Sequence, residues 1–226
     1  MTLSPRLRMI IGFVLANTAI IAVAGLVLLN KPASPPSIQG VVLLQARDLP
    51  PFRLLDHHNR DFSNRDLLGA WHLISYGFTT CPDICPTTLA QLAQVKALLN
   101  ENGDDLPILF YTVDHRRDTV GQLASYMPFF HAEFIGLTHL DSDDNLHLPF
   151  EEGLGIVAEL TPTEQNPNDS ADQQAYQVSH GVTLFLLNPQ GQLQAILKPG
   201  TDKQRNKVFD AHTIYKDYLQ VRDYFG

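Results

Sequence analysis

The chain has only two cysteines, and both lie in the segment Cys81-Pro82-Asp83-Ile84-Cys85. The segment follows an apolar stretch and precedes an amphipathic one, so we expect it to form the turn between a strand and a helix. Residues four apart share one face of a helix, and the free N–H groups and dipole of its first turn favour thiolate over thiol. Two such sulfurs suit one soft metal ion such as Cu(I), and an added imidazole allows Cu(II) as well.

A dithiol also permits other chemistry. A structural disulfide would close a loop of about five residues and contribute only about 2 kcal/mol. A thiol-disulfide reductase would use Cys81 as the attacking thiolate and Cys85 as the resolving thiol. A peroxide-reducing enzyme on the same fold is a weaker hypothesis, because the usual surroundings of its nucleophile are absent from the sequence. A structural zinc site normally has four protein ligands, one more than these residues suggest.

Nine histidines are candidates for a third metal ligand. His115 follows a predicted strand at 107–113, and the carboxyl ends of parallel strands lie at the sheet edge that carries the cysteine turn. His180 precedes a predicted strand at 182–187, whose beginning falls on the same edge if that strand runs antiparallel. An imidazole ligand distinguishes a metal site from a reductase, since a reductase needs none. The other seven should be structural or solvent-exposed: His57, His58, His72, His131, His139, His147 and His212.

The hydrophobic periodicity predicts an α/β fold. Apolar runs bounded by turn residues predict strands at 71–77, 107–113 and 133–137, and hairpins at 52–62 and 182–197. Apolar steps of three and four predict helices at 86–99, 118–127, 141–153 and 203–224, with a short one capped by Ser63 and ending at Leu68. The polar segment 159–174 should be a long mobile loop. No internal repeat is visible. The order of elements indicates a mixed central sheet flanked by helices, and a dithiol between a strand and a helix suggests the thioredoxin-like fold.

The N-terminus predicts a transmembrane anchor. Met9 to Leu29 is uncharged and long enough to cross about 30 Å of hydrocarbon as a helix. Arg6 and Arg8 precede it, so residues 1–8 should stay in the cytoplasm while the rest is exported. A cleaved signal peptide is the alternative, because Ala22-Val23-Ala24 resembles a cleavage site. The apolar run continues well beyond that site, which favours the anchor.

The remaining sequence divides into a spacer and a domain. Residues 30–39 are rich in proline and should form a stalk, and residues 40–226 should form the single globular domain. The formal net charge of the chain is -8, which argues against a nucleic-acid partner.

The cysteine segment and its surroundings, residues 76–89 (YGFTTCPDICPTTL), resemble the Sco/SenC family of copper proteins, which serve cytochrome c oxidase assembly. Four further segments resemble the same family in the same order: 112–114, 117–119, 134–138, and 178–180 followed by a strand and the turn 188–191. The resemblance covers roughly Pro51 to the C-terminus, and the anchor and stalk also match the family's architecture.

The resemblance implies a thioredoxin-like fold in which Cys81, Cys85 and His180 bind one copper ion, as Cu(I) or Cu(II). It implies a metallochaperone rather than an enzyme, supplying the binuclear copper centre of cytochrome c oxidase subunit II. Alternatively, Cys81 and Cys85 would form a redox disulfide that keeps the cysteines of that partner reduced. The expected location is a bacterial inner membrane, crossed once, with the C-terminal domain in the periplasm.

The resemblance also directs attention to residues beside the site. Asp83 and Asp114 match acidic positions of the family, where they would steer copper or the partner, unless they serve as a helix cap or a loop hydrogen bond. His115 stands where the family usually has proline, and is expected either to bind copper transiently or to have no role. Ser179 stands where the family commonly has aspartate, which removes a neighbour able to orient the imidazole.

Overall fold

The computed structural model describes residues 4–29, 34–140, 144–162 and 176–226. It divides into two compact units, one up to Pro35 and one from Pro36 to Gly226. The first contains helix α1 (Pro5–Leu29), whose segment Arg8–Leu26 is long and apolar enough to cross a membrane. A signal sequence near an N-terminus has the same length and composition. Residues 1–3 of the predicted cytoplasmic end and 30–33 of the predicted stalk lie outside the described residues.

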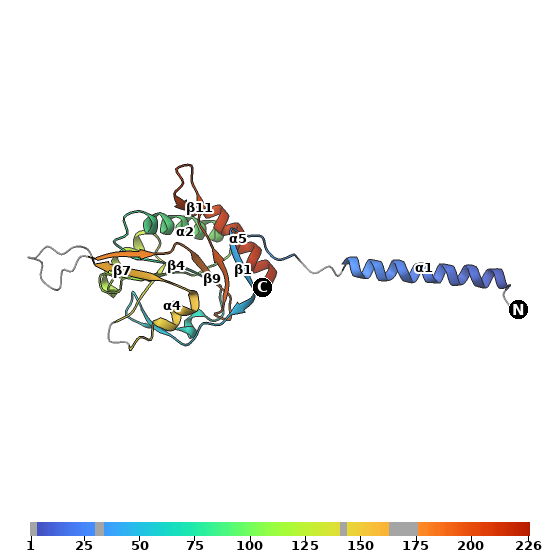
Figure 1. Ribbon diagram of the computed structural model, residues 1–226, viewed down its shortest axis with the longest axis horizontal. Helices are drawn as coiled ribbons and strands as arrows, with labels where there is room; N and C mark the ends of the chain where they lie inside the picture. Colours follow the sequence, from blue (N-terminus) through green and yellow to red (C-terminus); the bar gives the residue numbers. More distant parts are fainter. Residues whose placement is uncertain (1–3, 30–33, 141–143, 163–175) are drawn as a thin grey trace, which may run out of the picture. The chain divides into compact units, whose positions relative to one another are not determined.

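The second unit is built on an eight-stranded sheet in the order β1-β10-β9-β4-β5-β6-β2-β3 (Figure 1). The three central strands β4 (His72–Gly77), β5 (Ile108–Thr112) and β6 (Ile135–Thr138) run parallel. Antiparallel strands extend the sheet on both sides: β9 (Leu184–Leu187), β10 (Leu193–Leu197) and β1 (Gly40–Arg47) on one, and β2 (Arg53–Asp56) and β3 (Asp61–Ser63) on the other. This is the mixed central sheet that the sequence predicts.

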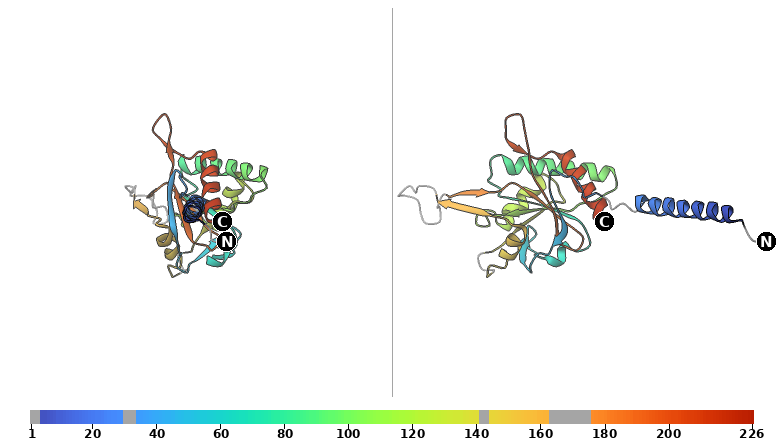
Figure 2. Two further views of the ribbon diagram at one scale, coloured as in Figure 1. Left: turned by 90° about the vertical axis from the view of Figure 1, so that its right-hand side faces the viewer. Right: turned by 45° about the vertical axis from the view of Figure 1, so that its right-hand side comes forward.

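Each face of the sheet carries its own core. Side chains alternate along a strand, so Leu73 of β4 belongs to one core and its neighbour Ile74 to the other. Helices α2 (Ile84–Glu101) and α5 (Ala211–Phe225) cover the first face, and α4 (Leu148–Leu154) lies on the opposite face (Figures 1 and 2). The predicted short helix is the 3-10 helix η1 (Asn64–Leu67), which Ser63 caps as expected.

The helix predicted at 118–127 begins later than expected, which corrects that boundary. Helix α3 is Val120–Tyr126, followed by the 3-10 helix η2 (Met127–Phe129). Asp118 lies before it in a loop, where its buried carboxylate accepts hydrogen bonds from other loops, and the side chain of Thr119 caps the helix through the Gln122 N–H.

The other two predicted helices are also shorter than expected. The last one starts at Ala211, because Asp210 caps it and the preceding residues form a small hairpin of β11 (Gly200–Thr201) and β12 (Lys207–Val208). In the helix predicted at 141–153, residues 144–147 are turns and residues 141–143 lie outside the described residues.

The loop predicted at 159–174 is wrong at its beginning. Strand β7 (Ala158–Pro162) pairs antiparallel with β8 (Tyr176–His180), forming a two-stranded ribbon apart from the main sheet. The rest of the predicted loop, 163–174, lies outside the described residues. His180 is therefore the last residue of its own strand, and only then does the chain continue to β9, which begins at Leu184.

Candidate metal centre

The cysteine segment forms the turn between β4 and α2. The buried central strand β4 ends at Gly77, and the Cys81 N–H donates to the Phe78 carbonyl to close a tight turn before the helix. Helix α2 begins at Ile84, two residues earlier than predicted, so Cys85 lies in its first turn. Both cysteines are buried and are free thiols. The prediction of a dithiol at a strand–helix turn is confirmed.

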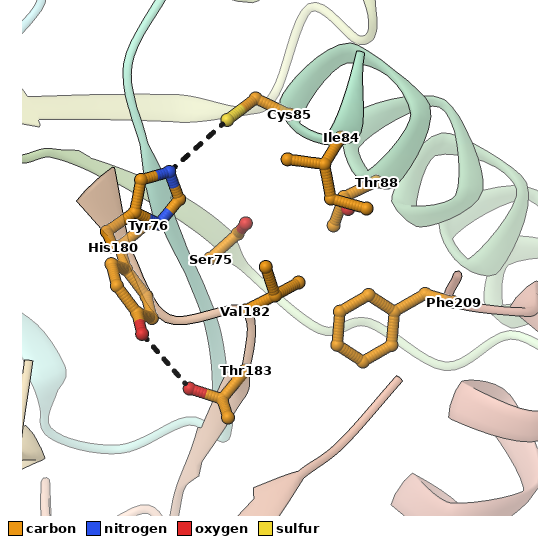
Figure 3. Close-up of a pocket in the computed structure, with 9 residues that line it drawn as sticks. All are labelled: Ser75, Tyr76, Ile84, Cys85, Thr88, His180, Val182, Thr183 and Phe209. Atoms are coloured by element: carbon orange, nitrogen blue, oxygen red, sulfur yellow. Dashed lines mark hydrogen bonds between the residues drawn. The ribbon is translucent and has the colours of Figure 1, made fainter. Parts of the chain in front are cut away.

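Strand β8 places the third predicted ligand beside this turn. The Cys85 Sγ and the His180 Nε2 are 3.9 Å apart, although the two residues are 95 positions apart in the chain (Figure 3). The His180 Nδ1 lies 2.6 Å from the Gly181 carbonyl oxygen. A carbonyl oxygen only accepts, so Nδ1 carries the proton and Nε2 directs a lone pair toward the sulfur. This contact orients the imidazole without the aspartate that Ser179 replaces; Ser179 is exposed and lies on the opposite face of β8.

Aromatic rings enclose the imidazole. The Tyr76 ring centroid is 5.4 Å and the Phe78 ring centroid 5.7 Å from that of His180. A pocket of about 10 Å³, lined in part by Tyr76, Cys85, Thr88 and His180, opens beside the pair (Figure 3). Such a volume is about what one water molecule needs. In the described part of the chain, no three His, Cys, Asp or Glu side chains surround a point closely enough to hold a metal ion. For Cys81, Cys85 and His180 to bind one ion together, at least one of these side chains must therefore turn toward the other two.

Burial favours the neutral forms of Cys85 and His180. Burial raises the pKa of the Cys85 thiol well above its ordinary value; a backbone hydrogen bond from Phe78 opposes this, and the neighbouring Cys81 thiol adds to it. Burial also lowers the pKa of His180, against the effect of its hydrogen bond to Gly181. For Cys85, burial thus outweighs the helix N-terminus, which the sequence analysis expected to favour thiolate. A metal cation bound there would displace the thiol proton.

One residue that positions the site was missed by the sequence analysis. The fully buried carboxylate of Asp118 accepts hydrogen bonds from the Thr79 N–H at 2.8 Å, the Thr79 hydroxyl at 2.6 Å and the Thr112 hydroxyl at 2.6 Å. It thereby joins the cysteine turn to the end of β5. The sequence analysis identifies the segment 117–119 but places Asp118 in a helix. The sequence does not reveal which loop N–H groups need an acceptor, so the role of this carboxylate could not be predicted.

The three neighbouring residues singled out by the sequence have different surroundings. Asp83 is exposed at the N-cap position of α2, and its side chain makes no capping hydrogen bond. Asp114 is buried and accepts hydrogen bonds from the Arg117 guanidinium and the Tyr176 hydroxyl. The His115 ring lies against His139, with centroids 3.9 Å apart. Asp114 therefore fits the loop hydrogen bond foreseen as the alternative to steering copper.

The remaining histidines have the ordinary roles expected of them where the structure shows their contacts. The His57 Nδ1 accepts from the Gly136 N–H at 2.9 Å, and His72 lies 3.0 Å from the Ala70 carbonyl oxygen. His139 stacks on His147, with centroids 3.5 Å apart and an interplanar angle of 4°. Each of these contacts is structural.

Fold and site together define a thioredoxin-like protein with two thiols and an imidazole at the end of its central strands. Comparison with known proteins identifies it more closely. The model of the SCO1/SenC family matches residues 44–212, so the chain belongs to that family.

Individual relatives agree with this assignment. A candidate copper-binding protein of Stutzerimonas stutzeri is 34% identical over 160 residues, covering 70% of this chain and 72% of that protein. The crystal structure of yeast Sco1 is 28% identical with a TM-score of 0.63, covering 78% of this chain and 98% of the other. Arabidopsis thaliana ScoI with copper bound is 26% identical with a TM-score of 0.60, covering 77% and 98%.

Proposed function

We propose that this chain is a membrane-anchored metallochaperone that binds one copper ion through Cys81, Cys85 and His180. Its acceptor would be the binuclear copper centre of cytochrome c oxidase subunit II. The observation that carries the proposal is the 3.9 Å approach of the His180 Nε2 to the Cys85 Sγ. A reductase or a structural disulfide gives no reason for an imidazole at that position.

The chemistry of the three side chains supports copper. Thiolates are soft ligands that select Cu(I), and the neutral imidazole adds a donor that also serves Cu(II). The His180 Nε2 needs no deprotonation, because its proton is on Nδ1 and burial lowers its pKa. The copper-bound structure of the Arabidopsis relative supports the same cargo. Zinc is less well matched, since a structural zinc site takes a fourth protein ligand.

The N-terminal helix supports a location of the domain outside the cytoplasm. If the apolar part of α1 is the anchor, Arg6 and Arg8 at its N-terminal end favour a domain on the non-cytoplasmic side, which is the periplasm in a bacterium. The exposed carboxylate of Asp83, beside the dithiol, is then available to meet a partner surface.

A second function shares the same residues. The Cys81–Cys85 pair would reduce the partner's cysteines by forming a disulfide, and the adjacency of the two free thiols favours it. The raised pKa of Cys85 opposes fast exchange by that thiol, because thiolate is the reactive form.

Copper stoichiometry of the full-length chain in detergent tests the proposal. We expect about one copper per chain, with visible thiolate-to-Cu(II) absorption, and loss of stable loading in Cys81→Ser, Cys85→Ser and His180→Ala. His115→Ala is the matched control and should load normally, because its ring lies against His139. Full loading of His180→Ala would reject this ligand set. Rapid reduction of an unrelated disulfide by the copper-free chain would favour the reductase instead.

A further inference from the structure

Strand β8 carries His180 at one end and is held at its other end by a buried carboxylate. Asp114, which follows β5, accepts a hydrogen bond from the Tyr176 hydroxyl through one oxygen and from the Arg117 guanidinium through the other. The carboxylate is 1% exposed, and its loop is fixed by a bond from the Asp114 N–H to the Thr112 hydroxyl at 3.0 Å. Tyr176 is therefore tied to the central sheet rather than only to β7.

Arg117 adds two further contacts to the same strand end. Its guanidinium lies over the Tyr176 ring, 4.1 Å from the centroid, and donates to the Tyr176 carbonyl oxygen at 3.5 Å. The same guanidinium is 5.9 Å from the Phe78 ring, which in turn meets the edge of the His180 ring. A cation over an aromatic face and a charge-assisted hydrogen bond to a buried carboxylate both stabilise this strand end.

Because Tyr176 and His180 lie on the same strand, holding Tyr176 in place also fixes the orientation of the His180 imidazole. Tyr176, Val178 and His180 are half-buried, whereas the two residues between them are exposed. Side chains two and four positions apart point to one face of a strand, so the anchored tyrosine and the ligand histidine share a face. Val178 packs against the core between them. Any rotation or slip of β8 would turn the imidazole away from Cys85.

We propose that Asp114, Arg117 and Tyr176, here called the Asp114 anchor, position His180 for metal binding and thereby set how tightly copper is held. This inference rests on the proposed function. The anchor contains none of the three proposed copper ligands, so it acts by keeping β8 in its binding-competent position. If the anchor is removed, only a fraction of molecules presents the imidazole correctly, and the apparent affinity falls to that fraction of its full value.

The test uses full-length chain in detergent and a Cu(I)-specific chelator as competitor. Tyr176→Phe removes one hydroxyl and should weaken copper binding about tenfold, the size expected for one lost hydrogen bond to a charged acceptor. Release of copper to the chelator should become faster by a similar factor, while the amount of copper bound at saturation stays near one ion per chain. Arg117→Gln should act in the same direction. Tyr224→Phe and Arg116→Gln, changes of the same kind at exposed positions, should leave affinity and release unchanged.

Two further measurements distinguish positioning from general destabilisation. In a His180→Ala background, where only two thiolates remain, Tyr176→Phe should cause no additional loss of residual Cu(I) affinity. An equal loss in that background would overturn the proposal, as would unchanged affinity and release in Tyr176→Phe itself. Amide hydrogen exchange over 176–180 in the copper-free chain should be faster in Tyr176→Phe than in Tyr224→Phe. That readout does not depend on copper, so it supports or refutes the anchor even if the wild-type chain binds none.

Discussion

Gly77 ends strand β4 directly against the thiol of Cys85, and its replacement by alanine tests how closely the site is built. A Cβ at Gly77 would lie well under 3.0 Å from the Cys85 Sγ, a separation that real Cβ atoms do not show. It would also contact the Phe110 Cε2 at 3.5 Å and the Cys85 Cβ at 3.6 Å. Phe110 is fully buried and cannot retreat, so the sulfur is the atom that must move.

The size of the effect follows from the two ways of relieving the overlap. Keeping the sulfur in place overpacks the core and costs about 1–3 kcal/mol of folding free energy. Rotating Cys85 about χ1 to another staggered position removes the overlap. The rotation also takes the sulfur away from the His180 Nε2, which lies 3.9 Å from it in the wild-type chain. We therefore expect Gly77→Ala to lower the unfolding free energy by about 1–2 kcal/mol and to weaken copper binding at least about tenfold.

Urea unfolding and chelator competition, with the Cu(II)–thiolate absorption band as a geometric readout, measure both effects. Gly121→Ala is the matched control. Gly121 lies in α3, where a Cβ would meet only the Thr119 Oγ1 at 4.0 Å. Alanine there should stabilise the chain by up to about 1 kcal/mol and leave copper binding unchanged. Wild-type affinity and an unshifted absorption band in Gly77→Ala would refute the claim that this glycine positions the thiol.

Three further predictions concern other residues. Asp118→Ala leaves one buried and two partly buried donors without their acceptor, so we expect a loss of about 3 kcal/mol in urea unfolding together with weaker copper binding; wild-type stability would contradict the assigned role. Asp210→Ala removes the cap of α5, whose side chain accepts from the Thr213 N–H at 2.8 Å, and should cost about 1 kcal/mol in unfolding without changing copper affinity. Because burial raises the pKa of Cys85, copper binding should release its thiol proton, and this thiol alone should make the apparent affinity rise about tenfold per pH unit below that pKa. The lowered pKa of His180 leaves its imidazole neutral near pH 7, so a proton does not compete with copper at His180 there. A copper affinity that does not change between about pH 6 and 8 would refute the predicted release of the thiol proton.

The central strands could be predicted because burial on both faces leaves a clear pattern in the sequence. Strands β4 and β5 are buried along their whole length, so their residues form continuous apolar runs. The first strand, β1, carries a weaker pattern: it is at the edge of the sheet, pairs only with β10, and is half or fully exposed at every position. The sequence analysis accordingly set the domain boundary at Gly40 without recognising a strand there.

The metal site could be predicted only in part, because the contacts that were not predicted join residues far apart in the sequence. Spacing predicted that Cys81 and Cys85 lie together, and the antiparallel direction of β9 brought His180 to the same edge as expected. Strand β8 itself was not foreseen, because a two-stranded ribbon alternating between half-buried and exposed positions has little apolar signal. The hydrogen bonds that Tyr176 donates to Asp114 and Thr79 donates to Asp118 join residues 62 and 39 positions apart, and no local pattern encodes them.

The protonation of Cys85 bears on how the proposed carrier would both hold and release its ion. A permanent metal site benefits from ligands that are already ionised, whereas burial keeps the Cys85 thiol protonated in the copper-free chain. Part of the free energy of copper binding is then offset by deprotonation, so the net affinity is lower than that of an exposed dithiol with the same geometry. Return of the proton favours the empty state. An acceptor whose thiols ionise more readily can therefore take the ion without first unfolding the donor, provided that His180 can withdraw. Among the described strands, β8 pairs with β7 and not with the main sheet, so the imidazole is held through that ribbon and the Asp114 anchor rather than through the strands that carry the cysteine turn.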